Sequence, residues 1–573
     1  MIARLFSFKG GVKPQSHKDA STRQPIAPAP LPTVLVVPLR QSVGPMLPLV
    51  EPGQHVLKGQ PIGAAESAFA VAAHAPTSGK VLAVELRALP HPSGLPGLCV
   101  VIEPDGEERW GERQTVDYRD LPPDEVRDAL RDAGVVGLGG AVFPSHIKLR
   151  PGKTGHTDTL IINGAECEPW ITCDDMLMRE RASAVVSGAA IMRHILRAAN
   201  VVIGIEDNKP QALAAVRTAI AQAGEKMEAV AVPTLYPAGG EKQLIRVLTG
   251  IEIPYGKLGP DYGVQCFNVG TAYSVHRALV LGEPLVSRVV TLTGNVERPH
   301  NLEVLIGTPI NELLALAGPR TDTDRYIMGG PMMGFTLPSI HVPVVKATNC
   351  VIAGNRALFP PPPPEMPCIR CGACTRACPM ELQPHELYWF SRARNFGKAQ
   401  EYSLFDCIEC GCCAYVCPSH IRLVDYYRFA KAEIRARERD KAASDAARSR
   451  FEFHNLRLER EKQEKAERLA AKTATAREAM AKKAPAAAET HAAEATAASV
   501  TKAAAPVPEA ASAEDPNKAL IAAAIERARA QKEKIKPKNT DNLTPEQRAE
   551  IAEIEVRRAR IRAMAKTPPE PPV

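Results

Sequence analysis

The sequence predicts a multidomain protein that combines α/β and β domains, and three observations lead to this prediction. Strand-like and helix-like segments alternate between residues 120 and 285, which is typical of a parallel sheet covered by helices. Short β-rich runs with glycine and proline between them precede that region, as in a small sandwich or barrel. A cysteine-rich run that occurs twice follows it. The 573 residues give room for about four domains.

Composition and charge exclude few classes of protein. Apolar residues make up 45% of the chain and aromatic residues only 5%, which indicates that part of it has no core. The net charge of +7 is compatible with a membrane surface or an acidic partner and is weak support for nucleic acid binding. The most apolar stretch contains Arg193, His194 and Arg197, so we predict no transmembrane helix. We expect no signal peptide, because the first residues lack a long apolar region.

The first 104 residues divide into an arm and a β domain. Residues 1–30 are polar and contain prolines, so we expect an N-terminal arm with little structure of its own. Residues 31–104 contain E51-P-G-Q-H-V-L-K-G-Q-P-I-G and A75-P-T-S-G-K-V, an order that resembles a biotinyl or lipoyl carrier domain. Such a carrier needs a lysine at the hairpin tip, where E66-S-A-F-A-V has none. We therefore interpret this region as a hammerhead-like structural domain.

Residues 115–285 are predicted to form a Rossmann-like α/β domain. The expected helices are 124–134, 185–199 and 212–223, and the expected strands are 159–164 and 201–205. A loop from Tyr236 leads into a further helix. This alternation predicts a parallel sheet with helices on both faces.

Three loops of this domain carry candidate binding groups. Gly137, Gly139 and Gly140 can place backbone N–H groups around a phosphate, and a glycine-rich turn without a ligand is the alternative. The spacing is not that of the dinucleotide fingerprint. N163-G-A-E-C-E-P-W follows a strand, where α/β sheets bind ligands, and a solvated acidic turn is the alternative. G239-G-E-K precedes a helix.

The most specific pattern is a cysteine spacing that occurs twice. C368-I-R-C-G-A-C-T-R-A-C-P and C407-I-E-C-G-C-C-A-Y-V-C-P share the spacing C-x2-C-x2-C-x3-C-P, with each cysteine of the second run 39 positions after its counterpart. This is the spacing of a two-cluster ferredoxin, in which the fourth cysteine of each run binds the other cluster. It assigns one [4Fe–4S] cluster to Cys368, Cys371, Cys374 and Cys417, and a second to Cys378, Cys407, Cys410 and Cys413.

Zinc and disulfide chemistry fit these cysteines less well. Zinc sites usually show two C-x2-C pairs, and a disulfide framework suits a small secreted domain. Cys412 fits no ligand position and is predicted to be a small packed side chain. Thiolate clusters beside unpaired cysteines favour a reducing cytoplasm.

The three loops, together with F267-N-V-G-T, resemble in order the flavin-binding loops of the NADH-oxidising subunit of respiratory complex I. The resemblance implies that the glycines of the first loop and Lys148 hold the phosphate and ribityl chain of FMN. It implies flavin contacts for Asn163, Glu166, Asn268 and Thr271, and an NADH pocket with Glu168, Glu241 and Phe143. The chain departs from the family at Ala165, Gly240 and Gly270, where the family has acidic residues.

Residues 286–345 fit a β-hairpin followed by a short helix and resemble the β-grasp (SLBB) domain that follows the flavin domain in that family. The methionines of M328-G-G-P-M-M-G are predicted to pack rather than to bind metal. F359-P-P-P-P-P is predicted to be a stiff spacer at the start of the ferredoxin domain, residues 359–430.

The composition changes at Lys431. Residues 431–573 are rich in Ala, Glu, Lys and Arg, and no aromatic residue follows Phe453, so we expect them to bury no core. Helices are expected from Asp515 and Thr544, where a capping residue precedes proline. A disordered tail and a basic helical segment that docks on a membrane or partner are the two interpretations.

The order of segments over residues 1–430, with F8-K-G-G-V-K-P near the start, resembles the C subunit of the Rnf (Rsx) electron-transport complex. The resemblance implies a peripheral subunit on the cytoplasmic side of a bacterial inner membrane, with FMN and two [4Fe–4S] clusters as cofactors. It would pass electrons between NADH and ferredoxin while membrane subunits move Na+ or H+, and its partners would be the membrane and ferredoxin-like subunits. A soluble flavin–iron–sulfur dehydrogenase subunit and a non-catalytic electron-transfer scaffold with an empty nucleotide pocket are the alternatives.

Overall fold

The computed structural model describes residues 4–40, 44–152, 155 and 157–481. The chain divides at Lys462, and all the hydrophobic cores described below are built from residues that precede it. The helices predicted from Asp515 and Thr544 lie outside the described residues.

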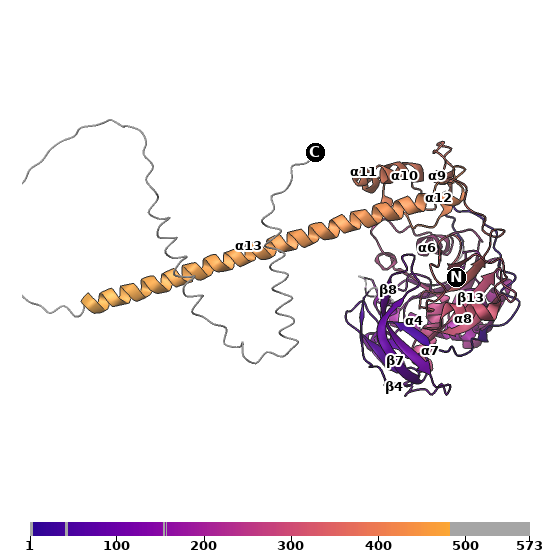
Figure 1. Cartoon of the computed structure of the whole chain (residues 1–573), viewed down its shortest axis with the longest axis horizontal. Coiled ribbons are helices and arrows are strands. Elements are labelled where there is room, and N and C mark those ends of the chain that lie inside the picture. Colours follow the sequence, from indigo (N-terminus) through magenta and orange to yellow (C-terminus); the bar gives the residue numbers. More distant parts are fainter. Residues whose placement is uncertain (1–3, 41–43, 153–154, 156, 482–573) are drawn as a thin grey trace, which may run out of the picture. The chain divides into compact units, whose positions relative to one another are not determined.

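Two small antiparallel sheets form the β domain (Figure 1). They bury a common core that includes Leu35, Ile62 and Ile102. The predicted hairpin tip at residues 66–71 joins two strands of the smaller sheet. The larger sheet has the order β2 (Leu35–Pro38), β8 (Pro96–Pro104), β7 (Gly79–Ala88), β4 (His55–Val56), and the smaller has the order β3 (Met46–Pro48), β5 (Pro61–Ala65), β6 (Ala73–His74).

A four-stranded parallel sheet is the centre of the α/β domain. Leu160 and Ile162 point into a core shared with α4, α5 and α7, whereas Ile161 points into a core shared with α6. Both faces are therefore covered, and the predicted parallel sheet is confirmed. The strand order is β11 (Glu228–Val232), β10 (Asn200–Glu206), β9 (Thr159–Gly164), β12 (Val264–Asn268). The helices are α1 (Pro123–Asp132), α2 (Ser145–Lys148), α3 (Cys173–Glu180), α4 (Ala182–Leu196), α5 (Pro210–Ala223), α6 (Glu241–Thr249) and α7 (Val269–Val280), with a 3-10 turn at Gly259–Tyr262.

A six-stranded sheet follows. It contains the predicted hairpin of β13 and β14, and α8 (Ile310–Ala317) comes next, as expected. The strand order is β1 (Ala27–Pro28), β14 (His300–Leu305), β13 (Ser287–Gly294), β17 (Cys350–Gly354), β15 (Arg325–Met328), β16 (Phe335–Thr336).

The N-terminal arm packs against three other parts of the chain. Phe8 is buried in the core beneath α6, Lys18 is buried in the α/β domain, and β1 pairs with β14. The arm has little regular structure, as expected, but it is not an independent segment. Its order comes from burial against distant residues, which its polar sequence does not reveal.

The cysteine runs lie in a small helical domain. Its core includes Leu387, Phe396, Leu404 and Tyr427. The helices are α9 (Ala373–Ala377), α10 (Pro384–Arg392), α11 (Phe396–Glu401), α12 (Cys412–Tyr415) and the long α13 (Leu423–Ala481; Figure 1), with a 3-10 turn at Leu404–Asp406.

The start of α13 corrects the predicted boundary of the tail at Lys431. The Lys431 ammonium donates to the carbonyl of Cys407 at 2.6 Å, and Ile434 is buried in the domain core. Packing therefore continues one helical turn beyond residue 430. Within the part of the chain that the structure describes, no helix combines the length and the apolar character that crossing a membrane requires.

Candidate functional site

Two cavities in the helical domain are each lined by four cysteines. We call one the outer cavity, lined by Cys368, Cys371, Cys374 and Cys417, and the other the inner cavity, lined by Cys378, Cys407, Cys410 and Cys413. These are the two crossed groups that the spacing predicts. Cys412 is fully buried and lines neither cavity.

The two runs have the same local backbone. Arg370 and Gly372 in the first run, and Glu409 and Gly411 in the second, all have positive φ, at 54°, 73°, 58° and 80°. These left-handed positions turn the chain around the cavity, and a short helix then begins after each glycine. The repeat in sequence is therefore a repeat in structure.

The donor set of each cavity fits an iron–sulfur cluster. Four thiols around one largely apolar space are the ligands of a [4Fe–4S] centre. Burial raises the pKa of Cys407 to about 11, so without a metal the Cys407 thiol would be protonated at neutral pH. Iron would supply the charge that stabilises the thiolates.

The inner cavity lies against the α/β domain through a contact that we call the junction. The Tyr236 hydroxyl donates to the carbonyl of Cys410 at 2.6 Å. Tyr236 and Val12 exchange two backbone hydrogen bonds, at 2.9 and 3.0 Å. The Gly11 N–H donates to the carbonyl of Ala377 at 3.0 Å, and a Cβ on Gly10 would lie 2.6 Å from the carbonyl oxygen of Cys378. The arm, the loop before α6 and both cysteine runs meet there.

The glycine loop lies at the start of α7. The Leu138 N–H donates to Thr271 Oγ1 at 3.0 Å, and a Cβ on Gly139 would lie 3.2 Å from the Asn268 Cβ. Gly140 has a φ of +111° and faces open space. Among the described residues, the N–H groups of Gly139 and Gly140 have no hydrogen-bond acceptor, so they are available to a phosphate.

Lys148 lies beside the predicted nucleotide residue Glu241. The Lys148 ammonium is 2.7 Å from a Glu241 carboxylate oxygen and 5.2 Å from the centre of the Phe267 ring. Both charged side chains are partly exposed, Glu241 by 44%. Phe143 lies at the end of the glycine loop, where its carbonyl accepts from the Gly137 N–H at 2.8 Å.

Asn163 joins two of the predicted loops. Its amide donates to the carbonyl of Gly239 at 2.8 Å, and its side-chain oxygen accepts from the Ala165 N–H at 3.0 Å. The Gly239 N–H in turn donates to the sulfur of Cys167 at 3.2 Å. The loops after β9 and before α6 therefore form one rigid surface.

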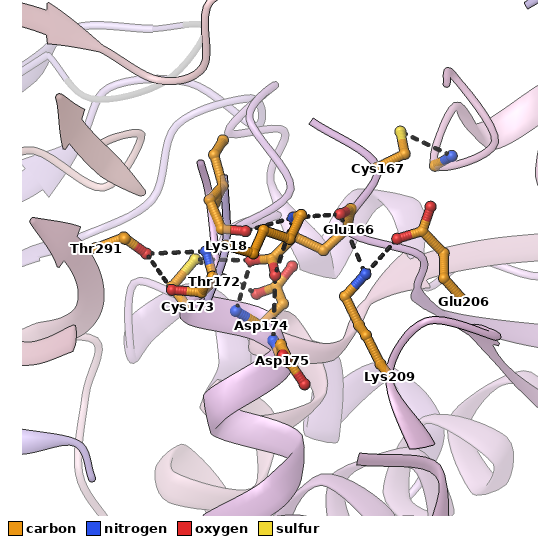
Figure 2. A network of polar contacts seen from close by, with 12 residues as sticks. Lys18, Glu166, Cys167, Thr172, Cys173, Asp174, Asp175, Glu206, Lys209 and Thr291 are labelled. Atoms are coloured by element: carbon orange, nitrogen blue, oxygen red, sulfur yellow. Dashed lines mark hydrogen bonds and ion pairs between the residues drawn. The ribbon is translucent and has the colours of Figure 1, made fainter. Parts of the chain in front are cut away.

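Glu166 has a role that its sequence position does not indicate. Its carboxylate accepts from the backbone N–H groups of Asp174, at 2.8 Å, and Asp175, at 3.4 Å, and so caps the N-terminus of α3 (Figure 2). The Lys18 ammonium is 3.7 Å from the same carboxylate. Burial raises the pKa of Glu166 to about 7, although Lys18 opposes this shift. The Asn268 amide donates to Asp174 at 2.6 Å, which links α3 to the start of α7.

Two buried lysines flank the backbone of Glu166. Lys18 donates to its carbonyl at 2.7 Å and Lys209 at 3.3 Å (Figure 2). Lys209 also forms a buried ion pair with Glu206. Neither lysine stands in a recognisable motif, because one belongs to the arm and the other follows a strand.

Glu168 lies in different surroundings from Glu241. Its carboxylate accepts from the N–H groups of Met332 and Met333, at 2.7 and 3.0 Å. Burial raises its pKa. Within the described residues no hydrogen bond or shared partner joins Glu168 to Glu241. The structure thus groups Glu241 with Lys148, and Glu168 with the methionine segment that follows β15.

Comparisons with known proteins agree with this division into domains. Family models match residues 6–107 (RnfC barrel sandwich hybrid domain), 130–277 (Nuo51 FMN-binding domain), 289–336 (SLBB domain) and 367–421 (4Fe-4S dicluster domain). The chain therefore combines an FMN-binding domain with a domain for two [4Fe–4S] clusters, the pair of cofactor domains typical of flavin and iron–sulfur electron-transfer proteins.

Curated relatives define the family more closely. Three proteins named as the C subunit of the ion-translocating oxidoreductase complex, from Yersinia pestis, Edwardsiella ictaluri and Pseudomonas aeruginosa, are 48%, 48% and 47% identical to this chain. The matches cover 80%, 81% and 81% of this chain and 74%, 58% and 60% of those proteins. The chain belongs to this family of ion-translocating oxidoreductase components, the RnfC family. It spans 58–66% of the length of the first relatives that it matches.

Among solved structures, an NAD+-reducing [NiFe]-hydrogenase in the air-oxidised state is similar over 56% of this chain and 62% of that chain. Its sequence identity is 19% and its TM-score is 0.38.

Proposed function

We propose that the chain is the subunit at which electrons enter a membrane-bound, ion-translocating NADH:ferredoxin oxidoreductase of the Rnf type. The observation that carries the proposal is the junction, where Tyr236 binds the backbone of Cys410 beside the inner cavity. The loop that Tyr236 begins also carries Gly239 and leads directly to Glu241, the first residue of α6, and both belong to the candidate flavin and nucleotide site. One short segment thus connects the two kinds of cofactor site.

Bound FMN supplies the exchange between the two-electron chemistry of NADH and the one-electron chemistry of the clusters. For the flavin phosphate and ribityl chain we assign the free N–H groups of Gly139 and Gly140, with Gly137 and the Lys148 ammonium. Asn163, Glu166, Asn268 and Thr271 shape and stiffen the surrounding loops through the hydrogen bonds described above.

Glu241 and Glu168 have different parts in this proposal. The partly exposed Glu241 carboxylate can accept hydrogen bonds from a nucleotide, and its ion pair with Lys148 fixes its direction. The buried Glu168 holds the methionine segment against the α/β domain. We retain Glu168 and Phe143 as nucleotide-pocket residues, with Glu241 as the one best placed to contact NADH.

The partners in this proposal are the other subunits of the complex, namely membrane subunits and ferredoxin-like subunits. The place of action is the cytoplasmic face of a bacterial inner membrane. Family membership supports both statements.

The test uses the full chain with iron, sulfide and FMN restored. We expect bound FMN and NADH-dependent reduction of ferricyanide. Glu241→Ala should lower this turnover roughly ten- to a hundredfold, because a hydrogen bond to a charged group contributes about 1.5–3 kcal/mol. The FMN content should stay unchanged. Glu252→Ala is the control, since it also removes an exposed carboxylate that is paired with a cation, Arg246.

Two results would contradict the proposal. Wild-type protein that holds FMN but oxidises no NADH would favour a non-catalytic electron-transfer scaffold. Equal turnover in Glu241→Ala and wild type would remove the nucleotide role from the loop before α6.

A further inference from the structure

The two cysteine runs repeat in structure, so each residue around the inner cavity has a counterpart around the outer cavity. This allows a direct comparison of what covers them. Ile408, between the first two cysteines of the second run, packs in the junction core with Tyr236 and Cys410. Its counterpart Ile369 is 68% exposed.

The neighbouring positions differ in the same way. A Cβ on Gly411 would lie 3.0 Å from the carbonyl of Met332, whereas one on Gly372 would meet only the guanidinium of Arg376 in its own run. Glu409 is held by Lys431 at 2.8 Å and by Arg428 at 2.9 Å. Other parts of the chain cover this surface of the second cysteine run, whereas the equivalent surface of the first run is bare.

The bare surface combines apolar and positively charged side chains. Ile369 and Met366 are exposed by 68% and 58%, and the cavity-lining Cys371 is exposed beside them. Arg370 and Arg376 are exposed, and in the part of the chain that the structure describes neither lies within 4 Å of a carboxylate. The Arg376 guanidinium donates to the carbonyl of Cys371 at 3.3 Å, which places its charge at the rim of the outer cavity.

We propose that this outer face, formed by Met366, Ile369, Arg370, Cys371 and Arg376, is the docking surface for an acidic one-electron redox protein. The unpaired arginines select a partner with carboxylates around its own redox centre, and the exposed Ile369 and Met366 supply the apolar contact. One electron passes between the outer cluster and the partner's centre, and no bond forms and no proton moves. The inference rests on the proposed function only in requiring that the cysteines bind clusters.

The geometry also gives the order of the two clusters. The inner cavity adjoins the candidate flavin site through the junction, and the outer cavity opens on the outer face. With clusters bound, the inner cavity would therefore hold the cluster nearer the flavin side and the outer cavity the one nearer the outer face.

The experiment uses the full chain with both clusters restored and an acidic plant-type [2Fe–2S] ferredoxin as the probe. Binding is measured by surface plasmon resonance over a range of NaCl concentrations. Separately, the clusters are reduced with dithionite, excess reductant is removed, and the rate of electron transfer to the ferredoxin is followed by stopped flow. Neither measurement needs NADH or FMN, so loss of NADH oxidation would contradict the proposed function without affecting this test.

The Arg370→Glu/Arg376→Glu double variant should bind about tenfold more weakly, as expected for two charge reversals at the rim, and most of the loss should be in the association rate. Its salt dependence should also be weaker. Ile369→Gln should weaken binding without changing the salt dependence. Lys226→Glu, a single charge reversal in the exposed loop between α5 and β11, is the control for charge reversal elsewhere on the surface and should bind as wild type does.

Unchanged binding and electron transfer in the double variant, with full iron content, would overturn the proposal. Binding to vesicles of anionic phospholipid that depends on Arg370 and Arg376, with no binding to the ferredoxin, would also overturn it by making the outer face a membrane contact. A double variant that lost iron would leave Ile369→Gln to decide, and wild-type affinity in that variant would count against the outer face.

Discussion

Tyr236→Phe should loosen the junction without emptying either cysteine cavity. The phenylalanine ring fills the same buried space, so the change removes only the hydroxyl that donates to the carbonyl of Cys410 at 2.6 Å. That carbonyl then lies buried without its partner, which costs about 1–3 kcal/mol. The equilibrium constant for local opening of the junction should increase roughly 5- to 150-fold.

Hydrogen exchange of the holoprotein measures this opening. The amides to follow are those of Gly11 and Val12, which donate to the carbonyls of Ala377 and Tyr236 across the junction. Their protection should fall by the factor given above, while amides of α5 keep theirs. Iron and FMN contents should equal those of the wild type.

Tyr427→Phe provides a matched control. The Tyr427 hydroxyl also donates to a buried carbonyl at 2.6 Å, that of Pro384, but both residues belong to the helical domain. This variant should destabilise the helical domain and leave the amides of Gly11 and Val12 protected. Unchanged protection of those two amides in Tyr236→Phe, or an equal loss in both variants, would refute the idea that Tyr236 fastens the two sites together.

Three further predictions follow from other residues. Cys378→Ser should remove the cluster of the inner cavity, and with it about half of roughly eight iron atoms per chain. Cys412→Ser should leave the iron content unchanged. Loss of the outer cluster alone in Cys378→Ser would contradict the crossed grouping. A chain that ends at Arg439 should keep its iron and FMN, because the contact of Glu438 with Gln400 at 3.5 Å lies before the cut. A drop in bound iron would show that the removed residues stabilise the folded domains. Burial lowers the pKa of Lys346 from 10.5 to about 7. Between these two pH values the native state binds fewer protons than the unfolded state. The free energy of unfolding therefore rises with pH across that window, by at most about 1.4 kcal/mol per pH unit. The urea midpoint of wild type should therefore rise from pH 7.5 to 9.5 more steeply than that of Lys346→Met, and parallel profiles would refute the shift.

The sequence predicted those parts of the site that depend on local spacing. Cys378 and Cys407 could be assigned to one group because the fourth cysteine of a run points away from the first three. The parallel sheet could be predicted because the strands are apolar runs between helical segments. Thr271 and the glycine loop could be paired only through the resemblance to a known family, and the structure places them in contact at 3.0 Å.

Several features of the site depend on contacts between distant segments and have no local pattern. Tyr236 is a single aromatic residue in a loop, so no periodicity marks it as buried. Lys18 is a polar residue in a polar arm, and its burial is explained by its carbonyl acceptors on Glu166 and Ile171 and by the Glu166 carboxylate, none of which is near it in sequence. Glu166 caps a helix that begins seven positions later. The capping patterns used to read a sequence place the capping residue next to the helix, so they do not identify Glu166. The tail boundary was placed too early because Lys431 resembles the solvated residues that follow it.

The path of the N-terminal arm has a consequence for synthesis of the protein. Lys9 contacts Glu381, 372 positions later, and Gly11 contacts Ala377. At about 5–20 residues per second, a ribosome needs roughly 20–75 s to make the chain between Lys9 and Glu381. During that time Gly10 and Gly11 have no helical domain on which to close. The junction is thus among the last parts of the body to form, and a nascent chain that stops short of the first cysteine run can fold its sheets but cannot connect them to a cluster.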